Sequence, residues 1–297
     1  MMRRTVLLLA TVAFGLILAS GVALAANVIA CPGGLCEGTT GDDEMTGTSG
    51  TDYIYAKEGN DTLRGLGAFD DLRGGPGNDD LDGGRGNDQY NIYDNNWGAD
   101  RISGDASGAE DWLIFQLSAT AGALTIDLVP SPDRDEVSSG ANTINFAPKV
   151  VIEWVQAGPN SDTIKGNSAN NYLSGSDLGD TLIGRRGNDN LVGDITVFDG
   201  NEGADILKGG LGKDTLDGGP LGDDLYGGKD NDDISDDYGP LSGKPADFDQ
   251  VSGGPGVDTI DVKDGDLNDV VCSGGGTDTV SSDSGDHVDD PTFCPLP

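Results

Sequence analysis

The feature that most constrains the fold is a nine-residue repeat of glycines, one acid and one apolar residue. Residues 74–90 read GGPGNDDLDGGRGNDQY, which is nearly the same phrase written twice. With the first glycine as position one, the acid falls at position six and the apolar residue at position eight. The phrase runs through residues 38–91, returns with one interruption through 157–235, and is weaker through 253–281. Such a period predicts a stack of similar units.

The residue types indicate what each unit does. Glycine tolerates positive φ, and Asp and Asn tolerate it better than most residues, so positions one to six can form a sharp turn. The rest of the unit has room for a short strand with one inward side chain. Eighteen residues would then make a full coil with two parallel sheets, and the inward residues of successive coils would form a continuous apolar column.

Stacking also brings the acids together. Equivalent residues lie about 4.8 Å apart in such a coil, which places Asp61 over Asp79 and Asp70 over Asp88. Two carboxylates about 5 Å apart repel by roughly 1 kcal/mol in water and about 3 kcal/mol at a dielectric of 20. A cation between them would remove this cost. Carboxylates and backbone carbonyls are hard oxygen ligands, which favours calcium; magnesium prefers a stricter octahedron and keeps its waters.

The phrase resembles the GGxGxDxUx nonapeptide of the RTX, or haemolysin-type, calcium-binding repeat family. The resemblance implies an all-β fold, a right-handed parallel β-roll in two or three blocks with an intervening β-rich segment. It also implies several calcium ions held between successive turns by position-six carboxylates and turn carbonyls. The candidate metal ligands are Asp43, Asp52, Asp61, Asp70, Asp79, Asp88, Asp162, Asp180, Asp189, Asp205, Asp214, Asp223, Asp232 and Asp258.

Some turns depart from the pattern and are weaker candidates. Ala56 replaces the first glycine, Asn171 replaces the acid, and the fourth glycine is missing at Ala68, Leu178, Leu221 and Asp230. The strongest candidates are the turns that end in Asp61, Asp79, Asp88, Asp189, Asp205 and Asp214.

The net charge excludes one class of partner. The chain has a formal charge of −35, with 52 acids against 17 lysines and arginines. Such a charge is typical of a disordered tail, but a disordered tail has no reason to keep its acids in register. No basic patch is present to meet phosphates, so nucleic acid is not expected as a partner.

The first 25 residues resemble a secretory signal. Arg3 and Arg4 precede an apolar run, and residues 23–25 read ALA, a cleavage pattern. We therefore expect a secreted, extracellular protein with no transmembrane domain in the mature chain. Two alternatives stay open: an uncleaved membrane anchor, and a lipoprotein whose lipid is carried by Cys31 in the sequence VIAC.

Four cysteines in an exported chain favour two disulfides. Cys31 and Cys36 precede the first repeat, and Cys272 and Cys294 bracket the last repeat and the tail. Local pairing would close each end of the stack. A zinc or redox role for the first pair is a weaker alternative, because the spacing is unusual and His287 is the single histidine.

The repeat blocks suggest a domain organisation. The expected units are a signal peptide at 1–25, an N-terminal cap at 26–37, a first β-roll block at 38–103, and a β-rich junction at 104–156. They continue with a second block at 157–235, and a final segment at 236–297 with a loop, a short third block and a C-terminal cap. A bulging loop is expected at 193–199. The junction holds Trp112 and Trp154, which we expect to pack between the blocks rather than to form a ligand-binding face.

The sequence gives little support for an enzyme. It contains no HExxH zinc motif and no GxSxG elbow, and its glycines are followed by acids that would repel phosphate. The leading hypothesis is a secreted calcium-binding protein that folds on binding calcium and acts through structure or binding. The alternatives are a cell-surface adhesin or envelope component, with a surface or matrix component as partner, and a calcium-assisted secreted hydrolase.

Overall fold

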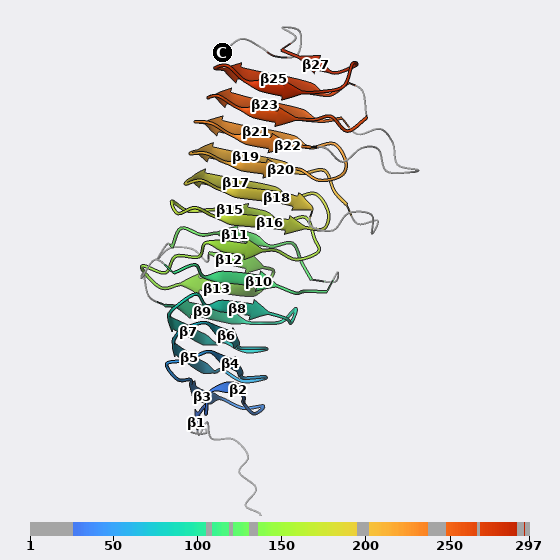
Figure 1. Ribbon diagram of the computed structural model, residues 1–297. Coiled ribbons are helices and arrows are strands. Elements are labelled where there is room, and N and C mark those ends of the chain that lie inside the picture. Colours follow the sequence, from blue (N-terminus) through green and yellow to red (C-terminus); the bar gives the residue numbers. More distant parts are fainter. Residues whose placement is uncertain are drawn as a thin grey trace, which may run out of the picture.

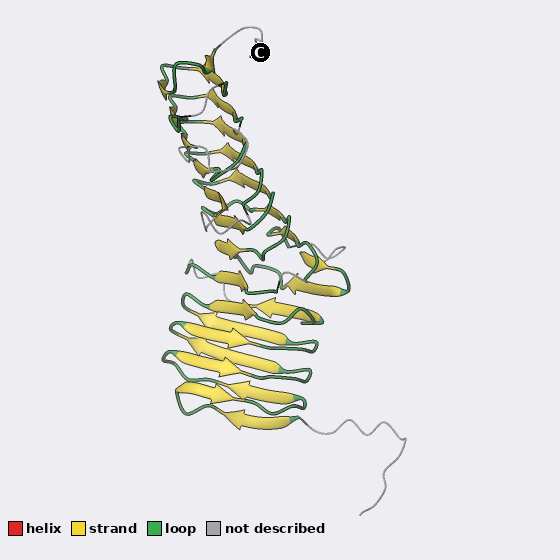
Figure 2. Cartoon of the chain, turned by 90° about the vertical axis from the view of Figure 1, so that its right-hand side faces the viewer, coloured by secondary structure: helices red, strands yellow, loops and turns green. Residues whose placement is uncertain are grey.

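The protein is a long stack of short strands that starts near the N-terminus and ends near the C-terminus (Figure 1). We analysed a computed structural model, which describes residues 26–104, 109–118, 121–130, 136–194, 202–236, 248–265, 268–289 and 294. Every regular element in these residues is a strand. Figure 2 shows the strands as successive rungs joined by loops at both sides of the stack. The all-β repeat fold expected from the sequence is therefore confirmed.

The strands form two sheets. Fifteen strands make the first sheet, in the order β1 (Asn27–Ala30), β3 (Asp43–Thr46), β5 (Thr62–Gly67), β7 (Asp80–Arg85), β9 (Ala99–Ser103), β13 (Asn142–Phe146), β12 (Val137–Ser139), β11 (Thr125–Asp127), β15 (Thr163–Lys165), β17 (Thr181–Arg186), β19 (Ile206–Leu211), β21 (Asp224–Lys229), β23 (Gln250–Pro255), β25 (Val270–Gly275) and β27 (His287–Val288). Twelve strands make the second sheet, in the order β2 (Gly34–Glu37), β4 (Asp52–Tyr55), β6 (Asp70–Arg73), β8 (Gln89–Ile92), β10 (Trp112–Phe115), β14 (Trp154–Gln156), β16 (Tyr172–Ser176), β18 (Asn190–Asp194), β20 (Thr215–Asp217), β22 (Asp233–Ser235), β24 (Thr259–Asp261) and β26 (Thr279–Ser281).

Consecutive repeats lie in alternate sheets, and each repeat pairs in parallel with the repeat after next in an eighteen-residue register, which makes a parallel β-roll. Leu63 lies opposite Leu81 in the first sheet, and Leu173 lies opposite Leu191 in the second. Extra residues do not disturb this register. Leu182 pairs with Leu207 although the two are further apart in sequence. Insertions are therefore accommodated at the turns, and the strands keep their alignment.

The core is a column formed by the apolar residues at position eight of successive repeats. This residue is fully or almost fully buried from Met45 and Ile54 at the N-terminal end to Ile260 and Val271 near the other end. Val280, in the last repeat, is only partly buried and packs against the column. Each buried Leu or Ile contributes roughly 1.5–3 kcal/mol, so the column is the main apolar support of the roll.

The junction belongs to the same two sheets. β10 and β14 continue the second sheet in parallel. In the first sheet, β12 pairs antiparallel with both β11 and β13, so one hairpin interrupts the parallel order there. The rings of Trp112 and Trp154 lie 5.2 Å apart, and Trp154 stacks on Tyr172 at 5.0 Å. The aromatic side chains of the junction thus pack on each other from rung to rung.

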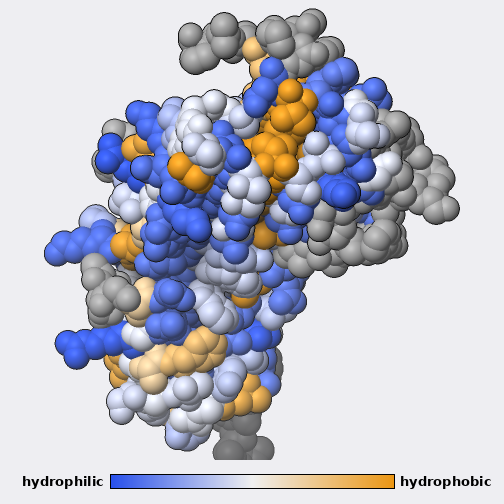
Figure 3. Space-filling view, turned by 45° about the horizontal axis from the view of Figure 1, so that its top comes forward, coloured by the Kyte–Doolittle hydropathy of each residue, from blue (hydrophilic) through white to orange (hydrophobic). Residues whose placement is uncertain are grey.

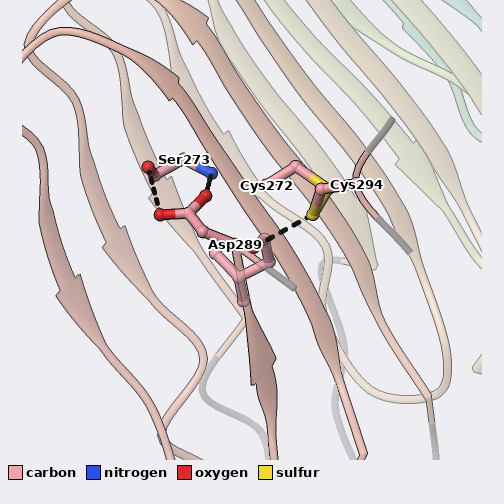
Figure 4. The surroundings of a disulfide bond; sticks show 5 residues. Cys272, Ser273, Asp289 and Cys294 are labelled. Atoms are coloured by element: carbon pink, nitrogen blue, oxygen red, sulfur yellow. Dashed lines mark hydrogen bonds between the residues drawn. A yellow bond between two sulfur atoms is a disulfide. The ribbon is translucent and has the colours of Figure 1, made fainter. Parts of the chain in front are cut away.

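Both ends of the stack carry a disulfide. Cys31 pairs with Cys36, and Cys272 pairs with Cys294, as the sequence predicted. Near the second disulfide, Asp289 accepts hydrogen bonds of 2.8 Å from both the N–H and the hydroxyl of Ser273 (Figure 4). The sulfur of Cys294 lies 3.6 Å from the carbonyl oxygen of Val271, a contact rather than a hydrogen bond because a disulfide sulfur carries no hydrogen.

The surface reflects the composition. The face in Figure 3 is mainly hydrophilic, with small hydrophobic patches between the polar side chains. No helix in the described residues is long and apolar enough to cross a membrane. The expected signal peptide, most of the expected loops at 193–199 and 236–249, and the last residues of the tail except Cys294 lie outside the described residues.

Candidate metal centre

The position-six side chains form two rows, one at each edge of the roll. The repeated contact is a hydrogen bond from the backbone N–H of one position-six residue to Oδ1 of the position-six residue one rung later. The Asp61 N–H donates to Asp79 and the Asp214 N–H donates to Asp232, at 2.8 and 2.9 Å. The stacking of Asp61 over Asp79 and Asp70 over Asp88 is therefore present. All fourteen candidate acids belong to these rows and are at most 2% exposed.

The second carboxylate oxygen of most of these residues has no partner. It is buried and makes no hydrogen bond in Asp61, Asp70, Asp79, Asp180, Asp189, Asp205, Asp214, Asp223, Asp232 and Asp258. Leaving a buried polar atom unsatisfied costs about 1–3 kcal/mol, and more for a charged group. So regular a set of unsatisfied oxygens needs a physical reason, such as a cation.

In several turns these oxygens face a backbone carbonyl across a narrow space beside the position-one glycine. A β-carbon placed on Gly227 would lie 2.5 Å from Oδ2 of Asp232 and 2.8 Å from the carbonyl oxygen of Gly253, one rung later. Gly253 has the same surroundings, with Asp258 Oδ2 and the Ser273 carbonyl oxygen both at 2.5 Å. A side chain at position one would therefore fill the space between a carboxylate and a carbonyl oxygen.

The donor set fits a hard divalent cation. Each site offers carboxylate oxygens and backbone carbonyl oxygens, which calcium prefers. No three Asp, Glu, His or Cys side chains of the described residues converge in a group suited to a metal ion. The backbone would therefore have to supply much of the coordination, as the resemblance to the nonapeptide repeat implies.

Four turns differ from the others, and they are the first two turns of each main block. In these turns the backbone N–H of the position-two residue donates to the position-six side chain of the same turn. Thr39 donates to Oδ2 of Asp43 and Thr48 to Oδ2 of Asp52, both at 2.6 Å. In the second block the same bonds join Gly158 to Asp162 at 3.1 Å and Asn167 to Asn171 at 2.9 Å. We call these four the capped turns.

The other turns differ by one backbone dihedral angle. Their position-two residue has positive φ, for example 98° at Gly75, 85° at Lys57 and 86° at Leu66. None of the four position-two residues of the capped turns has positive φ. We use the name open turns for the turns with positive φ at position two and a buried position-six acid that end in Asp61, Asp70, Asp79, Asp88, Asp180, Asp189, Asp214, Asp223, Asp232 and Asp258.

The turns that lack the fourth glycine keep the open shape. Ala68, Leu178, Leu221 and Asp230 all have positive φ, between 65° and 86°. Such values are uncommon for residues with a side chain, and they indicate that the stacked neighbours hold the turn in place. Loss of that glycine therefore does not remove the unpartnered oxygen, which is present in Asp70, Asp180, Asp223 and Asp232.

Burial raises the pKa of position-six acids in turns of both kinds. At Asp162, in a capped turn, burial raises the pKa to about 7 although the N–H groups of Leu124 and Gly158 oppose it. Burial is the largest effect on Asp70 and Asp79, where it raises the pKa to about 7 although a backbone N–H opposes it. Burial and the neighbouring carboxylates Asp205, Asp162 and Asp194 raise the pKa of Asp180 to about 10, against the Asp162 N–H, which lowers it.

In the capped turn of Asp43, burial also acts to raise the pKa. Bonds from the Thr39 N–H, the Asn27 amide and the Thr39 hydroxyl outweigh it and bring the pKa below its usual value. The added side-chain hydrogen bonds at Asp43 therefore stabilise its charged carboxylate, which the backbone N–H groups at Asp162 do not achieve by themselves.

The rows contain acids that the sequence interpretation did not include as ligands. Asp79 donates its N–H to Asp100, Asp88 to Asp111, and Asp111 to Glu153, so the second row runs through the junction. At the C-terminal end the rows continue through Asp249, Asp269 and Asp278. Each of these acids precedes an apolar residue by two positions, as in DRI, DWL, EWV and DQV. That three-residue signal survives where the glycines are lost.

A comparison with protein-family models identifies these turns. The model described as RTX calcium-binding nonapeptide repeat (4 copies) matches residues 37–67, 55–90, 152–182, 174–195 and 199–234. The chain belongs to the RTX calcium-binding repeat family. The matched residues contain all ten open turns except the one ending in Asp258, together with the four capped turns. This RTX chain is accordingly a calcium-binding repeat protein, and no curated protein matches it.

Proposed function

We propose that the chain is a secreted protein whose β-roll folds on binding Ca²⁺ between successive open turns, and that the folded roll has a structural or binding role. The observation that carries this proposal is the row of buried carboxylate oxygens without hydrogen-bond partners. An array of this kind is costly without a cation and favourable with one, because a divalent ion offsets both the lost hydration and the mutual repulsion.

We assign the ions to the open turns and extend the assignment to two further buried acids of the rows, Asp205 and Asp269. The proposed carboxylate ligands are Asp61, Asp70, Asp79, Asp88, Asp180, Asp189, Asp205, Asp214, Asp223, Asp232, Asp258 and Asp269. Position-one carbonyl oxygens would complete the coordination. We propose a different role for Asp43, Asp52 and Asp162, because their own turns already donate to the Oδ2 atom: they close the first turns of each block.

Calcium would then be the main switch of stability. With free calcium at ten times the dissociation constant, each ion contributes about 1.4 kcal/mol. Several such ions equal the whole stability of an ordinary domain, about 5–15 kcal/mol. The chain would remain largely unfolded where calcium is scarce and would fold in an extracellular medium.

Two further features support export. The first residues have the pattern of a secretory signal. The two disulfides are of a kind that persists in oxidising compartments and is rare in the cytosol.

The test is far-UV circular dichroism of residues 26–297, titrated with calcium from a chelated start. We expect a cooperative rise of β signal between micromolar and millimolar calcium, and no comparable rise with magnesium. The disulfides should be kept oxidised throughout, so that calcium is the single variable. A chelated protein that already has its full β signal, unchanged by calcium, would rule out the proposal.

A further inference from the structure

One turn on the first row contains an acid that the repeat does not call for. Asp236 occupies position one of the turn that ends in Asp249, where most turns have glycine. It is only 2% exposed, and its Oδ2 has no hydrogen-bond partner. Because the repeat needs no carboxylate at this position, its burial must be explained by its surroundings.

The Asp236 carboxylate lies where other turns place a carbonyl oxygen. Next to Gly227, the atoms nearest the missing β-carbon are a position-six carboxylate oxygen and the carbonyl oxygen of Gly253. Next to Gly218, the equivalent atoms are Oδ2 of Asp223 and Oδ2 of Asp236, the latter at 2.9 Å. A charged oxygen thus stands where other sites offer a neutral one.

A third carboxylate adjoins this pair. Burial raises the pKa of Asp249 to about 7, opposed by the N–H of Asp223 and by a side-chain hydrogen bond with Asp236. The Asp223 N–H donates to Oδ1 of Asp249 at 2.9 Å, the ordinary bond of the row. The Asp236 carboxylate therefore shares the space beside Gly218 with Asp223, and Asp249 follows on the next turn of the row.

We propose that Asp236 supplies an additional carboxylate ligand to the cation between the turns of Asp223 and Asp249, which makes this the tightest calcium site of the roll. The inference rests on the proposed calcium function and goes beyond the repeat pattern, in which position one provides only its backbone. Ligand charge is one of the two properties that set calcium affinity in proteins, the other being the rigidity of the site.

A second acid outside position six, Asp194, is also buried in this row and serves as a comparison with Asp236. Asp194, at position two of the turn that ends in Asp205, is 6% exposed, and its Oδ1 has no partner. Its other oxygen accepts a hydrogen bond from the N–H of Gly203 at 3.1 Å. Asp194 is held by its own turn, whereas Asp236 faces the acids of two turns, so Asp236 is the one that we assign to the ion.

The test compares calcium titrations of the full mature chain and two variants, followed by calorimetry from a chelated start. Asp236→Gly restores the glycine that other turns carry at position one, so the variant should fold as those turns do. Asp233→Asn is the matched control: it also removes one negative charge, three residues away, from an exposed side chain on β22. Circular dichroism at saturating calcium checks that all three proteins fold.

We expect the wild type to bind one ion about tenfold or more tightly than the rest. Asp236→Gly should lose that tight class without changing the total number of ions, and Asp233→Asn should titrate as the wild type does. Equal titrations of Asp236→Gly and wild type would overturn the inference and leave Asp236 as a carboxyl that shares a proton with Asp249. A wild type that binds no calcium would instead overturn the proposed function and this inference together.

Discussion

The first two turns of each block and the open turns that follow them share one sequence period. They differ in whether the position-six side chain accepts a hydrogen bond from its own turn. In a capped turn, the position-two N–H bonds the position-six side chain of its own turn. In the open turns of Asp61, Asp79 and Asp214, among others, positive φ at position two accompanies a buried carboxylate oxygen that has no partner. The φ angle of the position-two residue is therefore associated with whether its N–H bonds the position-six side chain of the same turn.

This difference has a structural use. A capped turn gives one oxygen of its position-six side chain a hydrogen-bond partner without an ion, so we expect the start of each block to form before calcium binds. The capped turns would then provide a template on which the open turns stack, because each repeat of a solenoid contacts only its neighbours. Asn171 supports this view, because a capped turn works with a neutral amide in place of the acid.

The largest expected effect tests the crowding of the open turns. Gly86 has φ of 129°, and a β-carbon there would overlap the carbonyl oxygen of Ala68. Gly41 has the same position in a capped turn, with nothing within 4 Å of its missing β-carbon. Gly86→Ala should lower the free energy of unfolding by about 3 kcal/mol or more, and Gly41→Ala by less than about 0.5 kcal/mol. Urea unfolding at saturating calcium measures both, and equal losses would contradict the distinction.

The next effect tests the acids themselves. At saturating calcium, Asp214→Asn in an open turn should weaken calcium binding and lower the free energy of unfolding by about 1–3 kcal/mol. In chelator the sign should reverse, because the substitution removes a buried charge that has no partner on Oδ2. Asp52→Asn in a capped turn should leave the calcium titration unchanged, since an amide oxygen can still accept the Thr48 N–H. Calorimetry and urea unfolding with and without calcium would show whether only Asp214→Asn depends on the ion.

Acidification should separate the open turns from the first capped turn, that of Asp43, without mutation. In an open turn, burial raises the folded pKa of Asp70 and Asp189 to about 7, above the unfolded value near 4. The folded state therefore binds more protons, and the stability of the calcium-free chain should rise as pH falls from about 7 toward 4.

Asp43 should behave in the opposite way. Its folded pKa lies below the usual value, so its stabilising contribution is present above about pH 4 and is lost at lower pH. Circular dichroism of the chelated protein against pH tests the open turns, because they far outnumber the capped ones. A chelated chain that loses β signal between pH 7 and 5 would show that the open carboxylates are not the source of its instability.

The smallest expected effect concerns the hydrogen bonds of the first capped turn, between Thr39 and Asp43. The Thr39 hydroxyl donates to Asp43 at about 3.1 Å, in addition to the backbone bond. Thr39→Val removes that hydroxyl and should lower the free energy of unfolding by about 0.5–1.5 kcal/mol, with the calcium affinity unchanged. A matched change at Thr62, outside the cap on β5, gives the background effect of losing a threonine hydroxyl. A shift of the calcium titration by Thr39→Val would place an ion at the first turn.

Much of the site could be predicted from the sequence. The period located the apolar column from Met45 to Ile260 and put the fourteen candidate acids in two buried rows. It did not reveal that the second row crosses the junction through Asp111 and Glu153, because the glycines that mark a turn are missing there. The pairing of Trp112 with Trp154 across 42 residues of chain exists only in the folded sheet.

The sequence by itself determined the repeat, the inward residues, the edge rows and the preference for an oxygen-binding cation, because each depends on residue type at fixed spacing. Only the tertiary structure decided which carboxylates remain unsatisfied. Residue type at position two does not settle this: Lys57 and Leu66 have positive φ, whereas Gly158 caps its turn. The outcome depends on the rung stacked on each turn, because contacts between residues about eighteen positions apart hold the backbone in one conformation or the other.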